Sequence, residues 1–224
     1  MVATIPQETF AFLGDLQANN SRDWFEANRA RYEAHWKAPA LAFVDALTAD
    51  MAALDPSLKA QGKINGSLRR INRDVRFSKD KSPYTASMHL VFWAGEHPNR
   101  SPGMHFVVYA GGVGFGSGLW GLDKDQLQTW RDMVVDPVEG PKVLAALDQA
   151  AAVGCTMGAP DLARLPKGYS AEGRAAELLR YKSVVARTHE GLHPASHLTG
   201  AGATDWALAM TAAHLPLLRL LMLL

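Results

Sequence analysis

A run of alternating glycines is the feature that most narrows the folds open to this chain. Residues 112–119 read Gly-Val-Gly-Phe-Gly-Ser-Gly-Leu, with glycine at every even position and a side chain at every odd one. A period of two is the side-chain period of a β-strand and does not match the period of a helix. The run therefore predicts a strand with one bare face. Another backbone, an aromatic ring such as Trp120, or a ligand could approach that face closely.

The first quarter of the chain has the period of helices instead. Residues 7–18 carry apolar side chains at helical spacing, and either Asn20 or Ser21 can cap a second helix. Pro39 suits the first turn of a third helix, which we expect to end at Asp55 and Pro56. Three helices are therefore expected before the first long strand.

The rest of the chain alternates between the two periods. Short apolar runs rich in aromatic and β-branched residues indicate strands at residues 88–93, 105–109 and 183–188, and helices are expected from 123, from 137 and over 171–181. Helices, then strands, then helices are typical of an α+β fold. We expect N-terminal helices, a mainly antiparallel sheet from about Ser67 to Gly118, and C-terminal helices packed on it. Residues 1–224 are read as a single domain.

Composition and charge exclude several classes of protein. With 224 residues, 48% of them hydrophobic, and a net charge of +1, the chain resembles an ordinary globular domain and lacks a global field for polyanions. The single cysteine, Cys155, cannot form an internal disulfide, and the first residues lack the pattern of a secretory signal. A cytoplasmic location is therefore expected.

The C-terminal segment is apolar enough to raise the question of a membrane. Residues 206–224 have nearly the length of a membrane span, but Pro216 and Arg219 fall inside the segment. We interpret it as a helix packed in the core that could also support a homo-oligomer, and we expect no membrane contact.

A basic motif stands out in this nearly neutral chain. Residues 69–84 read Arg-Arg-Ile-Asn-Arg-Asp-Val-Arg-Phe-Ser-Lys-Asp-Lys-Ser-Pro-Tyr, with six basic residues against two acids. Taken as an extended segment, residues 69–77 would place Ile71, Val75 and Phe77 on one face, with Arg73 set among them, and polar groups on the other. Residues 78–83 are expected to form a loop.

The motif resembles a family of uncharacterised, mostly bacterial proteins that is described as a domain of unknown function. Its signature is carried here by Arg70, Arg73, Asp74, Arg76, Phe77, Asp80, Lys81 and Tyr84. Residues 19–25 and 111–120 also resemble the family. The resemblance implies no established activity.

The residue types of the motif suit recognition of an anion. Guanidinium groups of Arg70, Arg73 and Arg76 match phosphate or carboxylate, and Lys81 adds a point charge. Asp74 and Tyr84 are the candidate catalytic, proton-handling groups. The expected ligand is an anionic small molecule. Whether the chain is an enzyme or a binding protein stays open.

Two alternatives compete with an anion site. The basic loop could dock onto an acidic partner, with nucleic acid the less favoured one because no stacking platform is interleaved with the charges. The arginines and acids could instead pair with one another and brace the loop against the sheet. Pairing of Arg73, Arg76 and Asp80 among themselves would favour the brace.

Two further segments match the sequence patterns of known sites but lack the expected structural context. Residues 116–121 fit Gly-x-Gly-x-x-Gly, but the glycines belong to a strand pattern rather than a turn that opens a helix, so no cofactor is expected. Residues 189–193 read His-Glu-x-x-His, and His197 follows. Pro194 and the strand pattern before His189 argue against a zinc helix. We expect no metal, although a loop site formed by His189, His193 and His197 stays open.

Three other residues are interpreted as structural. Cys155 has no activating neighbour in the sequence and is read as an inert small residue. His89 and His105 alternate with apolar residues on predicted strands, and each is read as an ordinary core or surface histidine.

Overall fold

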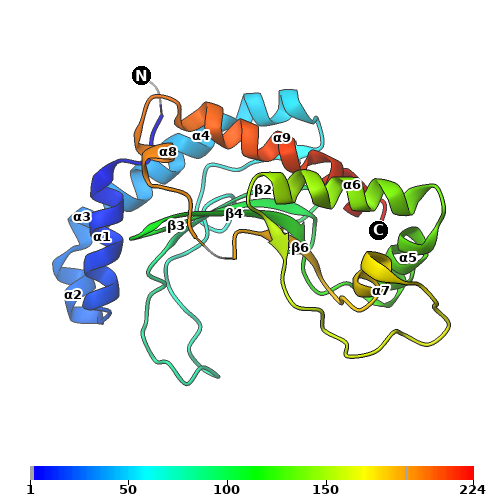
Figure 1. Ribbon diagram of the computed structural model, residues 1–224. Coiled ribbons are helices and arrows are strands. Elements are labelled where there is room, and N and C mark those ends of the chain that lie inside the picture. Colours follow the sequence, from blue (N-terminus) through cyan, green and yellow to red (C-terminus); the bar gives the residue numbers. More distant parts are fainter. Residues whose placement is uncertain (1–2, 190) are drawn as a thin grey trace.

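A six-stranded sheet forms the centre of the computed structural model, which describes residues 3–189 and 191–224 (Figure 1). The strand order is β1-β2-β3-β4-β6-β5, and every neighbouring pair is antiparallel. The strands are β1 (Leu58–Lys59), β2 (Met88–Ala94), β3 (Gly103–Tyr109), β4 (Gly112–Leu119), β5 (Thr156–Met157) and β6 (Val184–Arg187). With helices at both ends of the chain, this arrangement confirms the predicted α+β fold.

The helices flank the sheet in sequence, as expected. Those before the sheet are α1 (Gln7–Ala18), α2 (Arg22–Ala27), α3 (Arg29–Arg31), the π-helical η1 (Tyr32–Lys37) and α4 (Ala38–Leu54). Those after β4 are α5 (Lys124–Val135), α6 (Glu139–Ala152), α7 (Gly173–Leu178), α8 (Ser196–Thr199) and α9 (Ala203–Leu221). In Figure 1, α4, α6 and α9 lie above the sheet, and long loops extend below it.

In the described part of the chain, helices cover one face of the sheet. Phe106 of β3 packs edge-on against Trp206 of α9, and Phe115 of β4 packs in the same way against His214. Because successive side chains on a strand alternate between faces, the neighbours of these two phenylalanines point away from the helices. The hydrophobic core therefore lies between the sheet and α4, α6 and α9.

The helix boundaries follow local capping chemistry. Ser21 caps α2 by accepting a hydrogen bond from the Trp24 amide, and Asp123 with Gln126 forms a capping box at the start of α5. The helix predicted with Pro39 in its first turn is confirmed, because α4 begins at Ala38 and ends before Asp55. The π-helical η1 precedes α4 without a break in helical backbone, which the sequence did not predict, and proline is tolerated in the first turn of α4.

The C-terminal helix is a core element. Residues of α9 contact β4, α4 and α6, and its Leu217 and Leu218 are fully buried. This confirms the interpretation of the apolar segment as a packed helix. Among the described helices, none combines the length and the apolar character that a membrane crossing requires.

The basic motif does not extend the sheet, contrary to the expectation of an extended segment with an apolar face. Residues 69–84, called the motif loop below, contain no strand. The isolated bridge of Asn72 with Tyr84 lies within the loop, and the Arg69 amide donates to the His89 carbonyl of β2. Ile71 is buried, but Phe77 is 93% exposed. Residues 71–73 pair with residues 83–85, and the alternation breaks beyond Arg73, where no described strand pairs with the chain. After the short strand β1, the next strand of the sheet is β2, beyond the end of the motif loop.

Candidate functional site

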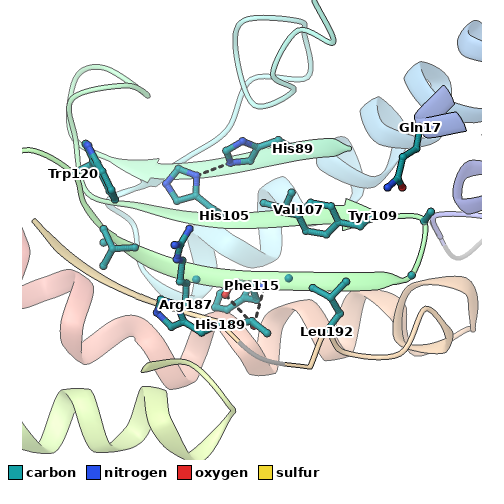
Figure 2. A pocket seen from close by; sticks show the side chains of 17 residues that line it. Gln17, His89, His105, Val107, Tyr109, Phe115, Trp120, Arg187, His189 and Leu192 are labelled. Atoms are coloured by element: carbon teal, nitrogen blue, oxygen red, sulfur yellow. Dashed lines mark hydrogen bonds between the residues drawn. The ribbon is translucent and has the colours of Figure 1, made fainter. Parts of the chain in front are cut away.

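A pocket of about 650 Å³ lies on the face of the sheet that the helices leave open (Figure 2). We call it the open-face pocket. Its floor and walls come from β3, β4 and β6, with contributions from β2, α1 and the segments after β4 and β6. The lining side chains and glycines include Gln17, His89, His105, Val107, Tyr109, Gly114, Gly116, Gly118, Trp120, Val185, Arg187, Thr188, His189 and Leu192.

The alternating glycines form the floor of this pocket. A Cβ added at Gly114 would meet only ordinary contacts, the nearest 3.5 Å away at Tyr109. A Cβ at Gly116 would lie 2.5 Å from the Cβ of Arg187, and at Gly118 it would collide with the backbone of β6. This confirms the prediction of a bare strand face and shows that another backbone, that of β6, approaches it closely.

A charged and a titratable side chain face each other across this bare floor. His105 pairs with Gly116 in the register of β3 and β4, and Gly116 pairs with Arg187 in the register of β4 and β6. Paired residues of an antiparallel sheet point to the same face. Figure 2 shows the Arg187 side chain extending over β4 in the direction of His105. Glycine between them keeps the intervening space open.

His105 is also joined to a second histidine. Its Nδ1 lies 2.8 Å from Nε2 of His89, which comes from the adjacent strand β2. Burial lowers the pKa of His89 to about 4 and that of His105 to about 3, and the positive charge of the nearby Arg69 adds to both shifts. The two imidazoles are therefore neutral at physiological pH. Each carries one N–H and one lone pair.

The rim of the pocket exposes aromatic surface to solvent. Trp120 is 77% exposed and Tyr109 is 40% exposed, on opposite sides of the glycine floor (Figure 2). Leu192 adds a further exposed apolar group at the rim. Exposed aromatic groups around a concave floor are a common feature of sites for small planar molecules.

The His-Glu-x-x-His residues do not lie on a helix. His189 lines the open-face pocket, whereas His193 pairs through its backbone with Val113 and its ring packs on Trp206. Glu190 lies outside the described residues. Within residues 3–189 and 191–224, no group of three or more potential ligands is placed to hold a metal ion.

The motif loop lines a neighbouring cavity of about 400 Å³, called the motif cavity. Arg73 is the only one of the four predicted ligand-binding cations that lines either cavity. Its guanidinium donates to Asp80 at 2.5 Å and to the Ser82 carbonyl at 3.1 Å. Gln17 of α1 lines both cavities and so marks where they adjoin.

The other predicted cations point elsewhere. Arg76 forms a two-pronged ion pair with Asp74 on the exposed part of the loop, with contacts of 2.7 and 2.9 Å. Lys81 donates to the Val75 carbonyl, and Arg70 is exposed. The structure thus separates Arg70, Arg73, Arg76 and Lys81 instead of converging them on one anion. Paired acids and arginines are what the brace alternative predicts.

The two predicted catalytic residues also lie apart from each other. Asp74 is in the exposed ion pair with Arg76, which is the largest cause of its lowered pKa. Tyr84 is buried, and its ring stacks on Phe25 with centroids 4.1 Å apart. Its backbone is held by the Asn20 side chain, and it lines the motif cavity. Their catalytic roles stay predictions.

Sequence reasoning missed most of the open-face pocket. His89 and His105 were read as ordinary histidines, and Arg187 and Gln17 were not singled out. The available signal was the parity of the strands, because residues paired with the even-numbered glycines must share the bare face. Without the strand register, that signal could not be connected to Arg187, which is 71 positions beyond Gly116.

Cys155 is buried beneath the open-face pocket. Its thiol lies 3.7 Å from the Thr188 hydroxyl and 3.5 Å from the Phe115 carbonyl. Burial raises the pKa of the thiol, so it stays protonated and unreactive. This agrees with its interpretation as a structural residue.

Comparison with known proteins gave one match. A family model described as conserved hypothetical protein, DUF2461, matches residues 8–203. No curated protein and no solved structure matched the chain. The match confirms the resemblance to a family of uncharacterised proteins and covers both the motif loop and the open-face pocket.

Proposed function

The chain belongs to the conserved hypothetical protein family DUF2461, and we propose that it binds a small planar organic anion in the open-face pocket. The observation that carries this proposal is the bare glycine floor between His105 and Arg187. A ring can lie flat on the floor against the aromatic rim, and a carboxylate or phosphate can pair with the guanidinium. The proposed ligand is still an anionic small molecule, as expected from the sequence, but the residue proposed to bind its acidic group is Arg187 instead of the motif arginines.

The charge of the pocket supports an anionic ligand. Among the described residues that line it, Arg187 is charged and none is an aspartate or glutamate. The histidine pair is neutral, so it contributes hydrogen bonds rather than charge. A single cation beside apolar and aromatic groups favours a ligand with one acidic group on a ring, in contrast to a highly charged one.

A thermal-shift screen of aromatic carboxylates, nucleotides and sugar phosphates tests this proposal. Gly114→Leu places a side chain on the floor where the nearest atom to an added Cβ is 3.5 Å away, so it fills the pocket without displacing β6. Arg187→Gln removes the cation. The matched control is Arg164→Gln, an exposed arginine in a distant loop.

A ligand at about 100 times its dissociation constant should stabilise the wild type by about 2.7 kcal/mol. We expect Gly114→Leu to abolish that shift, Arg187→Gln to weaken it for charged ligands only, and Arg164→Gln to leave it unchanged. Equal shifts in all four proteins, or no shift with any of these compounds, would overturn the proposal.

The motif loop supports a second candidate function, docking onto an acidic protein surface. Phe77 is 93% exposed and lies in a loop with exposed Arg70, Lys79 and Lys81. An apolar group surrounded by cations suits a partner that offers a hydrophobic contact ringed by carboxylates. Arg76 and Asp74 neutralise each other within this surface.

Binding to fluorescent poly-L-glutamate at low salt tests the second candidate. Substituting Arg70, Lys79 and Lys81 together by glutamine should abolish binding, and Phe77→Ser should weaken it without changing the melting temperature. Substituting Arg22, Arg100 and Arg164 by glutamine is the control of equal charge. Binding that survives the loop substitutions would contradict docking, and stronger binding to a single-stranded polynucleotide would indicate nucleic acid instead.

A further inference from the structure

The paired histidines on the wall of the open-face pocket form a continuous hydrogen-bonded unit with two outer nitrogens. His89 Nε2 and His105 Nδ1 share one hydrogen bond of 2.8 Å. Two neutral imidazoles together have two N–H protons and two lone pairs on ring nitrogens. The shared hydrogen bond uses one of these protons and one of these lone pairs. One outer nitrogen must therefore be a donor and the other an acceptor. These roles exchange when the outer acceptor takes up a proton, the shared proton crosses to the other ring, and the outer donor releases its proton.

This unit stands opposite the only charged side chain of the pocket's described lining. His105 and Arg187 are separated by one glycine in the register, which is two strand spacings, or about 10 Å between their Cα atoms. A planar molecule on the glycine floor would touch an imidazole at one edge and the guanidinium at the other. The arrangement places a base and a cation at the two ends of one ligand.

The described part of the pocket holds no activated nucleophile. No carboxylate lines it, and the Thr188 hydroxyl is held by the backbone of Phe115, from whose amide it accepts and to whose carbonyl it can donate. The Cys155 thiol is buried below and protonated. Chemistry that needs an activated nucleophile is not provided for, whereas proton transfer needs only a base and a site for negative charge.

We propose that the His89–His105 pair is the proton acceptor of the open-face pocket. This inference rests on the proposed function. The pocket would remove a proton from a planar ring compound whose resulting negative charge lies beside Arg187. The pair takes up the proton, and the electron pair of the broken bond stays on the ligand, delocalised onto its oxygen. Return of the proton to a different ligand atom completes an isomerisation and regenerates the pair, with no co-reactant.

Neutral histidines at physiological pH agree with this role. The titratable and charged groups around the pair are the nearby Arg69, Arg187 across the floor, and His189 and Tyr109 of the pocket lining. None of them is a carboxylate that would hold the pair protonated. The base should therefore stay active well below pH 6.5.

The probe for this activity is 5-nitrobenzisoxazole, a planar compound that loses a proton from carbon. When a base removes that proton, the electron pair forms a nitrile, the N–O bond breaks, and the phenolate oxygen takes the charge. Its unreactive analogue 5-nitrobenzotriazole measures binding separately, by calorimetry. Both are tested with the wild type, with His89→Gln and His105→Gln, which keep a polar group of similar size, and with Arg187→Gln.

The control is His97→Gln, because His97 is exposed in the turn between β2 and β3. We expect the wild type to accelerate the reaction about 100-fold or more over buffer, as positioned bases do. Each glutamine variant of the pair should lose at least tenfold of that rate, while His97→Gln keeps it. The wild-type rate should hold between pH 8 and pH 5, without an inflection near pH 6.5.

The outcomes separate this inference from the proposed function. If the analogue binds but the wild type reacts no faster than the pair variants, the proton-acceptor role is overturned, whereas the proposed ligand binding in the pocket is retained. An inflection near pH 6.5 in the dependence of the wild-type rate on pH would also overturn the role. This measurement uses the wild type alone and does not depend on whether a variant folds. If neither the analogue nor any compound of the screen binds, the proposed function fails and this inference with it.

Discussion

The Ser117 hydroxyl lies 2.7 Å from Nδ1 of His214, and this hydrogen bond joins the central strand β4 to the C-terminal helix inside the core. Both residues are fully buried, and the other ring nitrogen of His214, Nε2, has no partner among the described residues. Burial lowers the pKa of His214 to about 4. Protonating this ring would place an uncompensated charge between the sheet and α9.

The first prediction concerns the pH dependence of stability. The unfolded chain binds a proton at His214 near pH 6.5, whereas the folded chain does so only near pH 4. Between these values the unfolded state holds more protons, so stability falls as pH falls, by about 3 kcal/mol in total. His89 and His105 add to the loss in the same direction.

The variant His214→Gln isolates this contribution. The free energy of unfolding of both proteins is measured in urea at intervals from pH 7.5 to pH 4. As the pH falls, the free energy of the wild type should decrease more than that of the variant. A gap that stays constant across this range would show that His214 does not titrate differently in the two states.

The second prediction separates two glycines of β4. Gly116→Ala would place its Cβ 2.5 Å from the Cβ of Arg187 and 2.8 Å from the Ala186 carbonyl, so β6 must move. We expect a loss of about 1–3 kcal/mol, as for other overpacked sites. Gly114→Ala meets only ordinary contacts and should be neutral or stabilising by up to about 1 kcal/mol. Equal urea midpoints for the two variants would contradict the close approach of β6.

The third prediction decides whether the motif loop is braced by its arginines. Arg73 is half-buried and bonds Asp80 and the Ser82 carbonyl, so Arg73→Ala should lower the melting temperature. Arg76 pairs with Asp74 in an exposed position, and Arg76→Ala should leave the melting temperature unchanged.

Limited digestion with chymotrypsin reports on the same loop, because Phe77 is its exposed aromatic residue. Cleavage after Phe77 should be faster in Arg73→Ala than in the wild type, and Arg76→Ala serves as the matched control. Equal cleavage rates in all three proteins would show that Arg73 does not hold the loop.

The fourth prediction distinguishes the ring of Tyr84 from its hydroxyl. The ring stacks on Phe25, so Tyr84→Ala should cost about 3–5 kcal/mol in the free energy of unfolding. Tyr84→Phe keeps the stack, and its stability should match the wild type, because no hydrogen bond of the hydroxyl occurs within the described residues. If Tyr84→Phe instead abolishes an activity found with the ligands above, the predicted catalytic role of the hydroxyl would be supported.

The fold was predictable wherever local chemistry decides an element. Alternating glycines fixed β4, Asp123 fixed the start of α5, and Asp55 and Pro56 marked the end of α4. The two-residue strands β1 and β5 were missed because strands of that length carry no measurable period. The π turn before α4 was missed because it depends on packing rather than on a sequence pattern.

The site was less predictable, because it depends on strand register. The basic motif drew attention by its charge, yet its cations pair within the loop. The cation of the open-face pocket, Arg187, comes from β6, and the bases come from β2 and β3. These strands are far apart in the sequence, and only their order in the sheet brings the three side chains to one floor.

The order of the strands has a consequence for how copies of this protein can meet. Both outer strands of the sheet, β1 and β5, are only two residues long. So short an edge offers few free backbone groups to a foreign strand, which discourages edge-to-edge aggregation in a protein whose centre is rich in aromatic and glycine-containing strands. Self-association through the C-terminal helix, which stays a prediction, would have to use side-chain contacts instead of an extended sheet.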